Sequence, residues 1–140
     1  MSKPLLKNKS LKMLLSGLIV IAFVYVVYKA TKKEGFELSP SEVSKELDHG
    51  KKLVLIYADW CGHCKKIKPT WDKVSEKVNK EDDLKMVKVN CGEGTPEQKK
   101  LMSKYEVDGY PTILIVDNGK ATPYEGDRTE EALLKQINQL

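Results

Sequence analysis

The stretch LVLIYADWCGHCK, residues 53–65, decides how this chain is expected to fold. Its first six residues are apolar without a break, which indicates a strand buried on both faces of a sheet. After Cys61 the apolar residues recur every three or four positions, as on one face of an α-helix, at Ile67, Trp71, Val74 and Val78. The two cysteines therefore stand where a buried strand leads into the first turn of a helix.

Outward from this stretch, the chain alternates further helix and strand patterns. Capping boxes with a proline at the first helical position predict helices from Ser39 to about Gly50 and from Thr95 to about Tyr105. A last helix is expected over residues 129–139. Strands are expected at 84–89, 112–116 and 121–124. Parallel strands joined by helices, followed by a hairpin and a last helix, imply an α/β sandwich around a central sheet.

The motif Cys61-Gly62-His63-Cys64 places two cysteines three positions apart at the predicted helix start. A helix N-terminus offers unpaired N–H groups and the positive end of the helix dipole, and both stabilise an anionic sulfur. We therefore expect Cys61 to have a lowered pKa and to act as the nucleophile. Cys64, one turn further, should be more buried and act as the resolving thiol. His63 adds positive charge beside the thiolate, which favours the dithiol and makes the disulfide a stronger oxidant.

Other uses of these cysteines fit the sequence less well. A zinc site needs a second pair of ligands, and Cys91, His49 and His63 do not have that spacing. A covalent haem site needs a histidine directly after the second cysteine, where Lys65 stands. A purely structural disulfide between residues three apart would be strained and would stabilise little. A redox dithiol that needs neither a metal nor an organic cofactor is the favoured interpretation.

The positive charge of the chain is concentrated at its N-terminus. Residues 1–33 contain seven of the 24 basic residues and none of the 20 acidic ones, so the remaining chain has a net charge of −3. The charges of residues 34–140 are of mixed sign, which argues against nucleic acid as a partner. Residues 34–140 are long enough for one domain, and residues 1–33 are predicted to form a separate appendage.

This appendage is predicted to be a transmembrane signal anchor. Residues 11–28 are mostly apolar and would form a helix of about 27 Å, at the short end of what spans a bilayer. A cleaved signal peptide is the alternative, but Tyr28-Lys29-Ala30 does not match a small-residue cleavage site. More lysines precede the span than follow it, which favours a lumenal or extracytoplasmic domain. An endoplasmic-reticulum-like endomembrane, a bacterial envelope and a viral membrane all fit this prediction.

Several separate segments together resemble the thioredoxin fold. Residues 54–64, followed by Pro69, resemble its central strand and active-site helix, and the Cys-Gly-His-Cys version is similar to protein disulfide isomerase catalytic domains. The segments at 88–91, 105–112 and 124–128 resemble a strand end, the cis-proline segment and the turn into the last helix. The resemblance covers about residues 35–140. It implies a thioredoxin-like three-layer sandwich, with a mixed central sheet and helices on both faces.

The resemblance also implies a role for each residue of the motif. Cys61–Cys64 would be the redox-active disulfide, Trp60 the aromatic side chain beside it, and Gly62 part of the active-site support. Pro111 would be cis and pack against the two cysteines. The backbone of Tyr110 would be available to pair with a substrate strand.

Two further positions have expectations of their own. Leu55 stands six residues before Cys61, where the family usually has a buried carboxylate, whereas Lys88 matches the lysine that pairs with that acid. We therefore expect slower resolution by Cys64 and a Lys88 without its usual partner. Cys91 falls at a strand end with no partner cysteine in the chain. It is predicted to be either a buried, inert thiol or a regulatory or intermolecular one.

Taken together, the sequence predicts a membrane-anchored thiol–disulfide oxidoreductase that forms, isomerises or reduces protein disulfides. Its partners would be proteins with cysteines or disulfides, a redox-recycling protein or glutathione, and the lipid bilayer. A tethered disulfide reductase is one alternative. Another is a module that holds clients as mixed disulfides with little turnover, which the leucine at position 55 favours.

Overall fold

The computed structural model describes residues 9–31, 36–80 and 83–140, and the chain falls into two units, 1–33 and 34–140. In the first unit, α1 (Lys9–Thr31) is one helix whose side chains at positions 13–27 are exposed. Lys3 and Lys7, which belong to the predicted basic N-terminus, lie outside the described residues.

The predicted transmembrane anchor at residues 11–28 is not supported. Among the residues described, no helix is both long enough and apolar enough to cross a bilayer. The uncharged part of α1 between Lys12 and Lys29 is short, since its 16 residues rise about 24 Å as a helix. The hydrocarbon core of a typical bilayer is about 30 Å thick.

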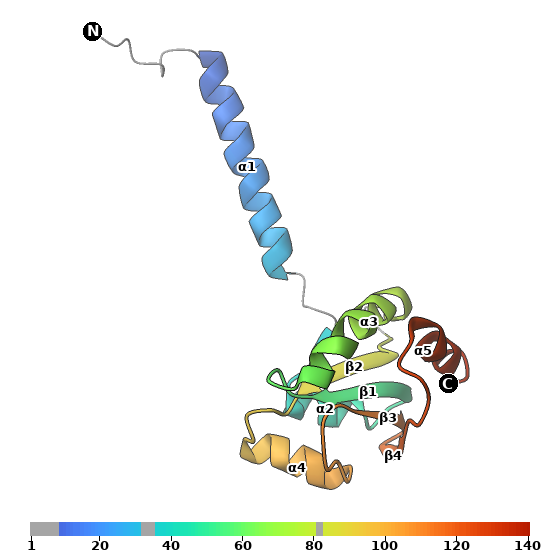
Figure 1. The fold of residues 1–140 in the computed structure, drawn as a ribbon. Coiled ribbons are helices and arrows are strands. Elements are labelled where there is room, and N and C mark those ends of the chain that lie inside the picture. The colour runs from blue at the N-terminus through green and yellow to red at the C-terminus, as the bar shows by residue number, and fades with distance from the viewer. Residues whose placement is uncertain (1–8, 32–35, 81–82) are drawn as a thin grey trace. The chain divides into compact units, whose positions relative to one another are not determined.

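The second unit is built around a mixed four-stranded sheet with the order β2-β1-β3-β4 (Figure 1). The central strand β1 (Lys51–Tyr57) has six buried residues out of seven, as its apolar run predicts. It pairs in parallel with β2 (Met86–Asn90) and antiparallel with β3 (Thr112–Asp117). The edge strand β4 (Lys120–Pro123) pairs antiparallel with β3.

The direction of β3 differs from the simple alternation of parallel strands and helices. Thr112 at the start of β3 pairs with Ile56 near the end of β1, so the two strands run in opposite directions. This register agrees with the mixed sheet that the family resemblance implies. It also brings Tyr110 and Pro111, which precede β3, to the end of β1 that leads to Cys61.

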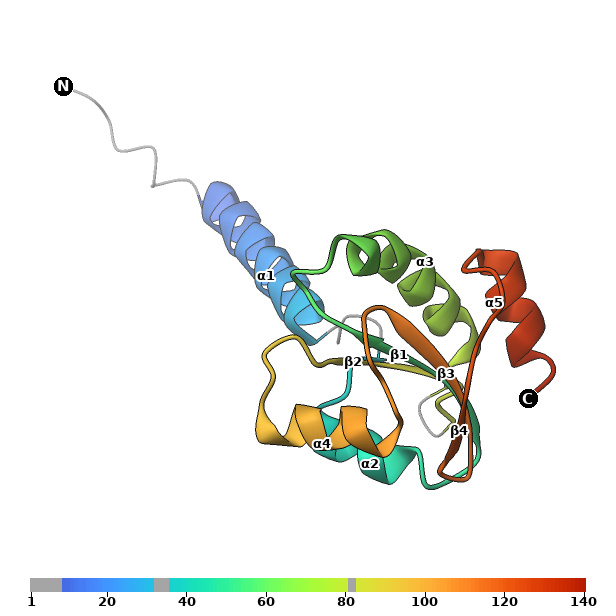
Figure 2. The ribbon, with the colours of Figure 1, turned by 60° about the horizontal axis from the view of Figure 1, so that its bottom comes forward.

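Helices cover both faces of the sheet (Figure 2). α3 (Gly62–Val78) and α5 (Glu130–Ile137) lie over one face, and α2 (Pro40–Glu46) and α4 (Pro96–Lys104) over the other. Two buried clusters fill the layers between. Leu53, Leu55 and Tyr57 of β1 belong to the cluster that also contains the cysteines of the motif and Trp71. Val54 and Ile56 belong to the cluster that contains Cys91 and Leu101. The result is the three-layer sandwich predicted.

The helix boundaries follow local signals in the sequence. Ser39 and Thr95 cap α2 and α4 through complete capping boxes, each with a proline in the first helical turn. α3 continues as a helix through Pro69. Glu130 in the first turn of α5 forms ion pairs with Lys73 and Lys77 of α3, which tie the two helices of this layer together.

Candidate active site

Cys61 is the N-cap residue of α3, so its sulfur lies at the unpaired N–H groups of the first turn. Its backbone is extended (φ −78°, ψ 120°), and its Sγ accepts a hydrogen bond from the Cys64 N–H over 3.4 Å. The Cys61 N–H donates to the Ala58 carbonyl over 3.0 Å, which fixes the turn from β1 into the helix. Cys61 is 8% exposed and Cys64 is fully buried, in the order predicted for a nucleophile and a resolving thiol.

The two thiols differ in acidity because they differ in surroundings. A hydrogen bond from the Cys64 thiol, helped by the N–H groups of Cys64 and His63, holds the pKa of Cys61 below that of an ordinary thiol. Burial, together with that same hydrogen bond to Cys61, raises the pKa of Cys64 to about 11. At neutral pH, Cys61 is therefore the better source of a thiolate, and Cys64 keeps its proton.

The loop before β3 contacts the Cys61 sulfur. The Tyr110–Pro111 peptide bond is cis, as the family resemblance implies. The Cys61 thiol donates to the Tyr110 carbonyl over 3.7 Å. Arg128, which precedes α5, donates to the Pro111 carbonyl over 3.4 Å. The Tyr110–Pro111 segment thus contacts both Cys61 and Arg128, which come from separate parts of the chain.

The remaining motif residues lie on the surface around Cys61. Trp60 is 67% exposed and meets the Tyr110 ring edge to face, with ring centroids 5.7 Å apart. Gly62 and His63 are exposed. The contact of His63 with the Cys61 sulfur is made by its backbone N–H group, whereas the prediction assigned the effect to imidazole charge.

Lys88 lacks its usual partner, as expected, but it has another one. Leu55 lies beside Lys88 in the β1–β2 register, and no carboxylate comes from that position. Lys88 is nevertheless paired, because its Nζ donates to Asp72 Oδ1 of α3 over 2.7 Å. The Lys88 side chain is completely buried, while that of Asp72 is 30% exposed. The acid that neutralises Lys88 therefore comes from the helix, two turns beyond Cys64.

Sequence reasoning missed several polar residues beside the motif. The positive charge of Arg128 partly offsets the raised pKa of Cys64. Asp59 receives hydrogen bonds from Lys68 Nζ (3.0 Å) and from Asn90 Nδ2 (2.7 Å). Arg128 could have been found from its position in the segment that leads into the last helix. For Asp59, Lys68 and Asn90 no sequence signal existed, because their positions are far apart in the chain.

Cys91 lies at the end of β2 and is 1% exposed, and burial raises the pKa of its thiol to about 11. All three cysteines are free thiols. In the part of the chain that is described, no three His, Cys, Asp or Glu side chains form a cluster that could hold a metal ion.

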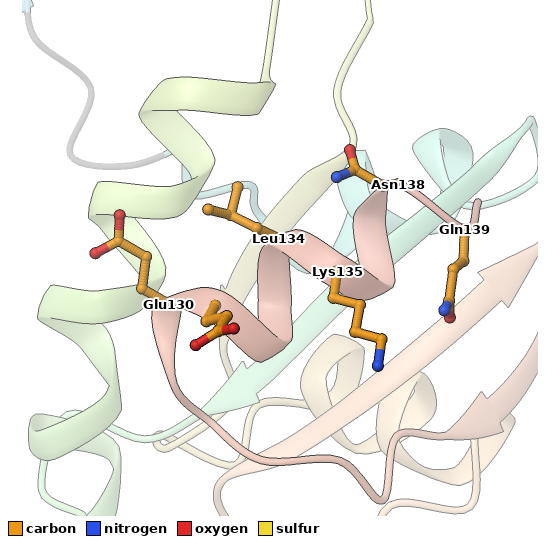
Figure 3. A pocket seen from close by; sticks show the side chains of 6 residues that line it. Glu130, Leu134, Lys135, Asn138 and Gln139 are labelled. Carbon is orange, nitrogen blue, oxygen red and sulfur yellow. The ribbon is translucent and has the colours of Figure 1, made fainter.

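An open pocket of about 780 Å³ lies along α5, and none of the cysteines lines it (Figure 3). Glu130, Leu134, Lys135, Asn138 and Gln139 line it, all from α5 or the residues directly after it. It contains no thiol, and its only aliphatic side chain is Leu134. Thiol–disulfide exchange takes place at an accessible sulfur and needs no enclosed cavity. The chemistry therefore belongs at Cys61 and not in this pocket.

A cysteine pair at the N-terminus of a helix, next to a cis-proline loop on a mixed sheet, defines a thioredoxin-like dithiol protein. The sequence matches the family model described as "Thioredoxin" over residues 28–139. The chain therefore belongs to the thioredoxin family.

Several relatives of this chain are named as protein disulfide isomerases or as proteins like them. Protein disulfide isomerase-like 2-1 of Oryza sativa subsp. japonica is 37% identical over 99% of this chain. Probable protein disulfide-isomerase A6 of Medicago sativa is 36% identical over 87% of it. The chain spans only 37% and 33% of the lengths of these two proteins. The first thioredoxin domain of mouse protein disulfide-isomerase A4 is similar in structure, with a TM-score of 0.63 and 28% identity, over 78% of this chain and 77% of that one.

Proposed function

We propose that this chain exchanges disulfides with protein substrates through Cys61 and Cys64. The observation that carries the proposal is the placement of Cys61. Cys61 is the N-cap residue of α3, its thiol has a lowered pKa, and its sulfur lies beside the Tyr110 carbonyl, with 8% of the residue exposed. A stabilised thiolate is the nucleophile that attack on a peptide disulfide needs.

In the reducing direction, the Cys61 thiolate attacks one sulfur of a substrate disulfide. A mixed disulfide forms at Cys61, and the other substrate sulfur leaves as a thiolate. Cys64 then loses its proton to solvent and attacks Cys61 Sγ. The Cys61–Cys64 disulfide forms, the second substrate sulfur is released, and the substrate has gained two electrons. The same steps in reverse oxidise a substrate dithiol, and a redox partner protein or glutathione would restore the starting form.

The direction of net flow is proposed to be oxidation or isomerisation. Thiolate stabilisation at Cys61 favours the dithiol form, and a couple whose dithiol is stabilised is a stronger oxidant. Such a couple works in a compartment where disulfides form, such as a secretory lumen or another extracytoplasmic space. The names of the two plant relatives support the same direction.

The test uses the full chain and its Cys61→Ser, Cys64→Ser and Cys91→Ser variants in insulin reduction and in reactivation of scrambled ribonuclease. We expect Cys61→Ser to abolish both activities and Cys91→Ser to leave them intact. Activity that survives Cys61→Ser contradicts the proposal. Equilibration in glutathione buffers then gives the direction. A potential of about −180 to −210 mV supports an oxidase or isomerase, and about −270 mV supports a reductase.

A client-holding module is a second candidate, and one observation favours it. Cys64 has a pKa of about 11 and no carboxylate from position 55 beside it, so resolution of a mixed disulfide at neutral pH should be slow. A holding module would accumulate covalent adducts at Cys61 in stoichiometric amounts and show no repeated turnover. Multiple turnovers of insulin by the wild-type chain contradict this candidate.

A further inference from the structure

The segment Asn90–Gly92, at the end of β2, holds the two aromatic residues that flank Cys61. The indole Nε1 of Trp60 donates to the Gly92 carbonyl over 2.9 Å. The hydroxyl of Tyr110 donates to the Cys91 carbonyl over 2.7 Å. Two consecutive carbonyl groups of one segment thus hold the side chains of Trp60 and Tyr110, whose rings also contact each other.

The segment is itself fixed at its first residue. Asn90 Nδ2 donates to Asp59 Oδ2 over 2.7 Å, and Asn90 Oδ1 accepts from the Gly92 N–H over 2.9 Å. The Asn90 carbonyl accepts from Gln98 Nε2 of α4 over 3.0 Å. The side chains of Asp59, in the loop after β1, and of Gln98, on α4, therefore hold the backbone of residues 90–92 in place. The carbonyl groups of this backbone in turn bond to Trp60 and Tyr110.

Gly92 is required at its position by close contact. A Cβ atom there would lie 2.8 Å from the Ala58 Cβ and 2.9 Å from the Trp60 Nε1. Ala58 is fully buried next to the motif and has no flexible side chain with which to withdraw. A larger residue at 92 would therefore displace Trp60 or the segment itself.

We infer that residues 90–92 and the Tyr110 hydroxyl are positioning groups for protein clients, acting through the loop that carries Tyr110 and Pro111. The inference rests on the proposed function. Tyr110 has its backbone carbonyl at the Cys61 sulfur, and its hydroxyl makes the hydrogen bond that joins this loop to the Asn90–Gly92 segment. A client with a peptide backbone depends on the position of this loop. A small disulfide without a peptide backbone needs only the Cys61 sulfur.

Comparing a peptide disulfide with a small disulfide therefore distinguishes positioning of protein clients from a general effect on the structure. The full-length Tyr110→Phe variant keeps the ring and loses only the hydroxyl. We expect kcat/KM for a short peptide disulfide to fall about fivefold, mainly through KM, which is the scale of one lost hydrogen bond. We expect the rate with hydroxyethyl disulfide, and the pH profile of Cys61 alkylation, to stay unchanged.

A matched control is Tyr105→Phe, which removes a buried hydroxyl at the C-cap of α4, in the cluster on the other face of the sheet. This control should leave both rates unchanged. Unchanged peptide kinetics in Tyr110→Phe, or an equal loss with both substrates, overturns the inference. A wild-type chain that reacts with neither substrate instead overturns the proposed function on which it rests.

Gly92→Ala provides a second, independent variant. It should lower the peptide rate while sparing the rate with hydroxyethyl disulfide, and it should change the quenching of Trp60 fluorescence by acrylamide. Trp60 is 67% exposed and Trp71 is fully buried, so the quenchable emission comes from Trp60. Unchanged quenching together with unchanged peptide kinetics in Gly92→Ala contradicts the inference.

Discussion

Asp72 on α3 neutralises the fully buried Lys88 on β2, with Oδ1 and Nζ 2.7 Å apart. A buried ammonium group without a partner is costly, because the lost hydration is not replaced. The pair therefore fixes the rotation of α3 over the sheet at a point two turns beyond Cys64. In this way a contact outside the motif supports the placement of the helix that carries both cysteines.

We predict that Asp72→Asn lowers the free energy of unfolding by about 2 kcal/mol, because it leaves the Lys88 charge buried without a counter-charge. This loss of stability is smaller than the loss expected on breaking a fully buried pair, because the Asp72 side chain is 30% exposed. Urea unfolding at neutral pH measures it.

Lys88→Met is the matched comparison, since it removes the charge and keeps an apolar chain of similar length. We expect it to cost less than Asp72→Asn, and we expect the double variant to be more stable than Asp72→Asn alone. Additive losses in the double variant would show that the two residues do not stabilise each other.

A second prediction concerns Asn79, which follows α3 and hydrogen-bonds the backbone at the start of β2. Its Oδ1 accepts from the N–H groups of Lys85 and Met86, each over 2.8 Å, and its Nδ2 donates to the Met86 carbonyl over 2.6 Å. Asn79→Ala should lower the free energy of unfolding by about 2 to 3 kcal/mol, since three hydrogen bonds to backbone are lost.

Asn138→Ala is its control, because Asn138 also stands at a helix C-cap but is exposed. It should change stability by less than about 0.5 kcal/mol. Equal losses in the two variants would assign the effect to helix capping and not to the β2 contacts.

A third prediction uses the raised pKa of Cys91, which is about 11 because the thiol is buried. An unfolded thiol loses its proton at lower pH than this folded one, so the folded state holds more protons between about pH 9 and 11. Stability is therefore fully present below the unfolded pKa and is lost as the pH rises through that window.

Cys91→Ala removes this group, so its free energy of unfolding should fall less steeply than that of the wild type. The slopes should differ by up to about 1.4 kcal/mol per pH unit. Urea unfolding of both proteins from pH 8 to 11 compares them. The tyrosine and lysine contributions are common to both, so parallel curves would exclude titration of a buried Cys91.

The sequence predicted most of the fold and the central chemistry because these depend on local patterns. An unbroken apolar run, two capping boxes and a cysteine pair at a helix start each carry their own physical signal. The cis bond before Pro111 was predicted from the Tyr-Pro-Thr segment in its family context. What the sequence did not reveal are contacts between groups from separate elements.

Lys88 and Trp60 illustrate that limit. The partner of Lys88 depends on how far α3 is rotated over β2, which no spacing in the sequence reveals. The indole of Trp60 bonds to the carbonyl of Gly92, a backbone group that every residue possesses. The apolar length of residues 11–28 was overestimated for a different reason, since lysines at both ends shorten the uncharged stretch.

The last prediction concerns Leu55, which belongs to the same buried cluster as Cys64 and lies beside Lys88 in the β1–β2 register. In the wild-type chain, release of a mixed disulfide from Cys61 needs the Cys64 thiolate, and burial, the largest cause of the raised pKa of Cys64, does not depend on a Cys61 thiolate. The release rate should therefore rise about tenfold per pH unit between pH 7 and 10. Leu55→Glu would place a carboxylate in this cluster to accept the Cys64 proton, so the rate at neutral pH should increase and depend less on pH.

Leu55→Gln separates proton transfer from a change of polarity, because the amide has a similar shape and cannot accept the proton as a base. We expect it to keep the steep wild-type dependence on pH, even if the polar group lowers stability. The measurement is release of β-mercaptoethanol from its mixed disulfide with Cys61, followed by mass spectrometry across this pH range. If Leu55→Glu and Leu55→Gln have the same slope, Cys64 is deprotonated directly by solvent in both. The acid missing from position 55 would then have no part in the slow resolution step.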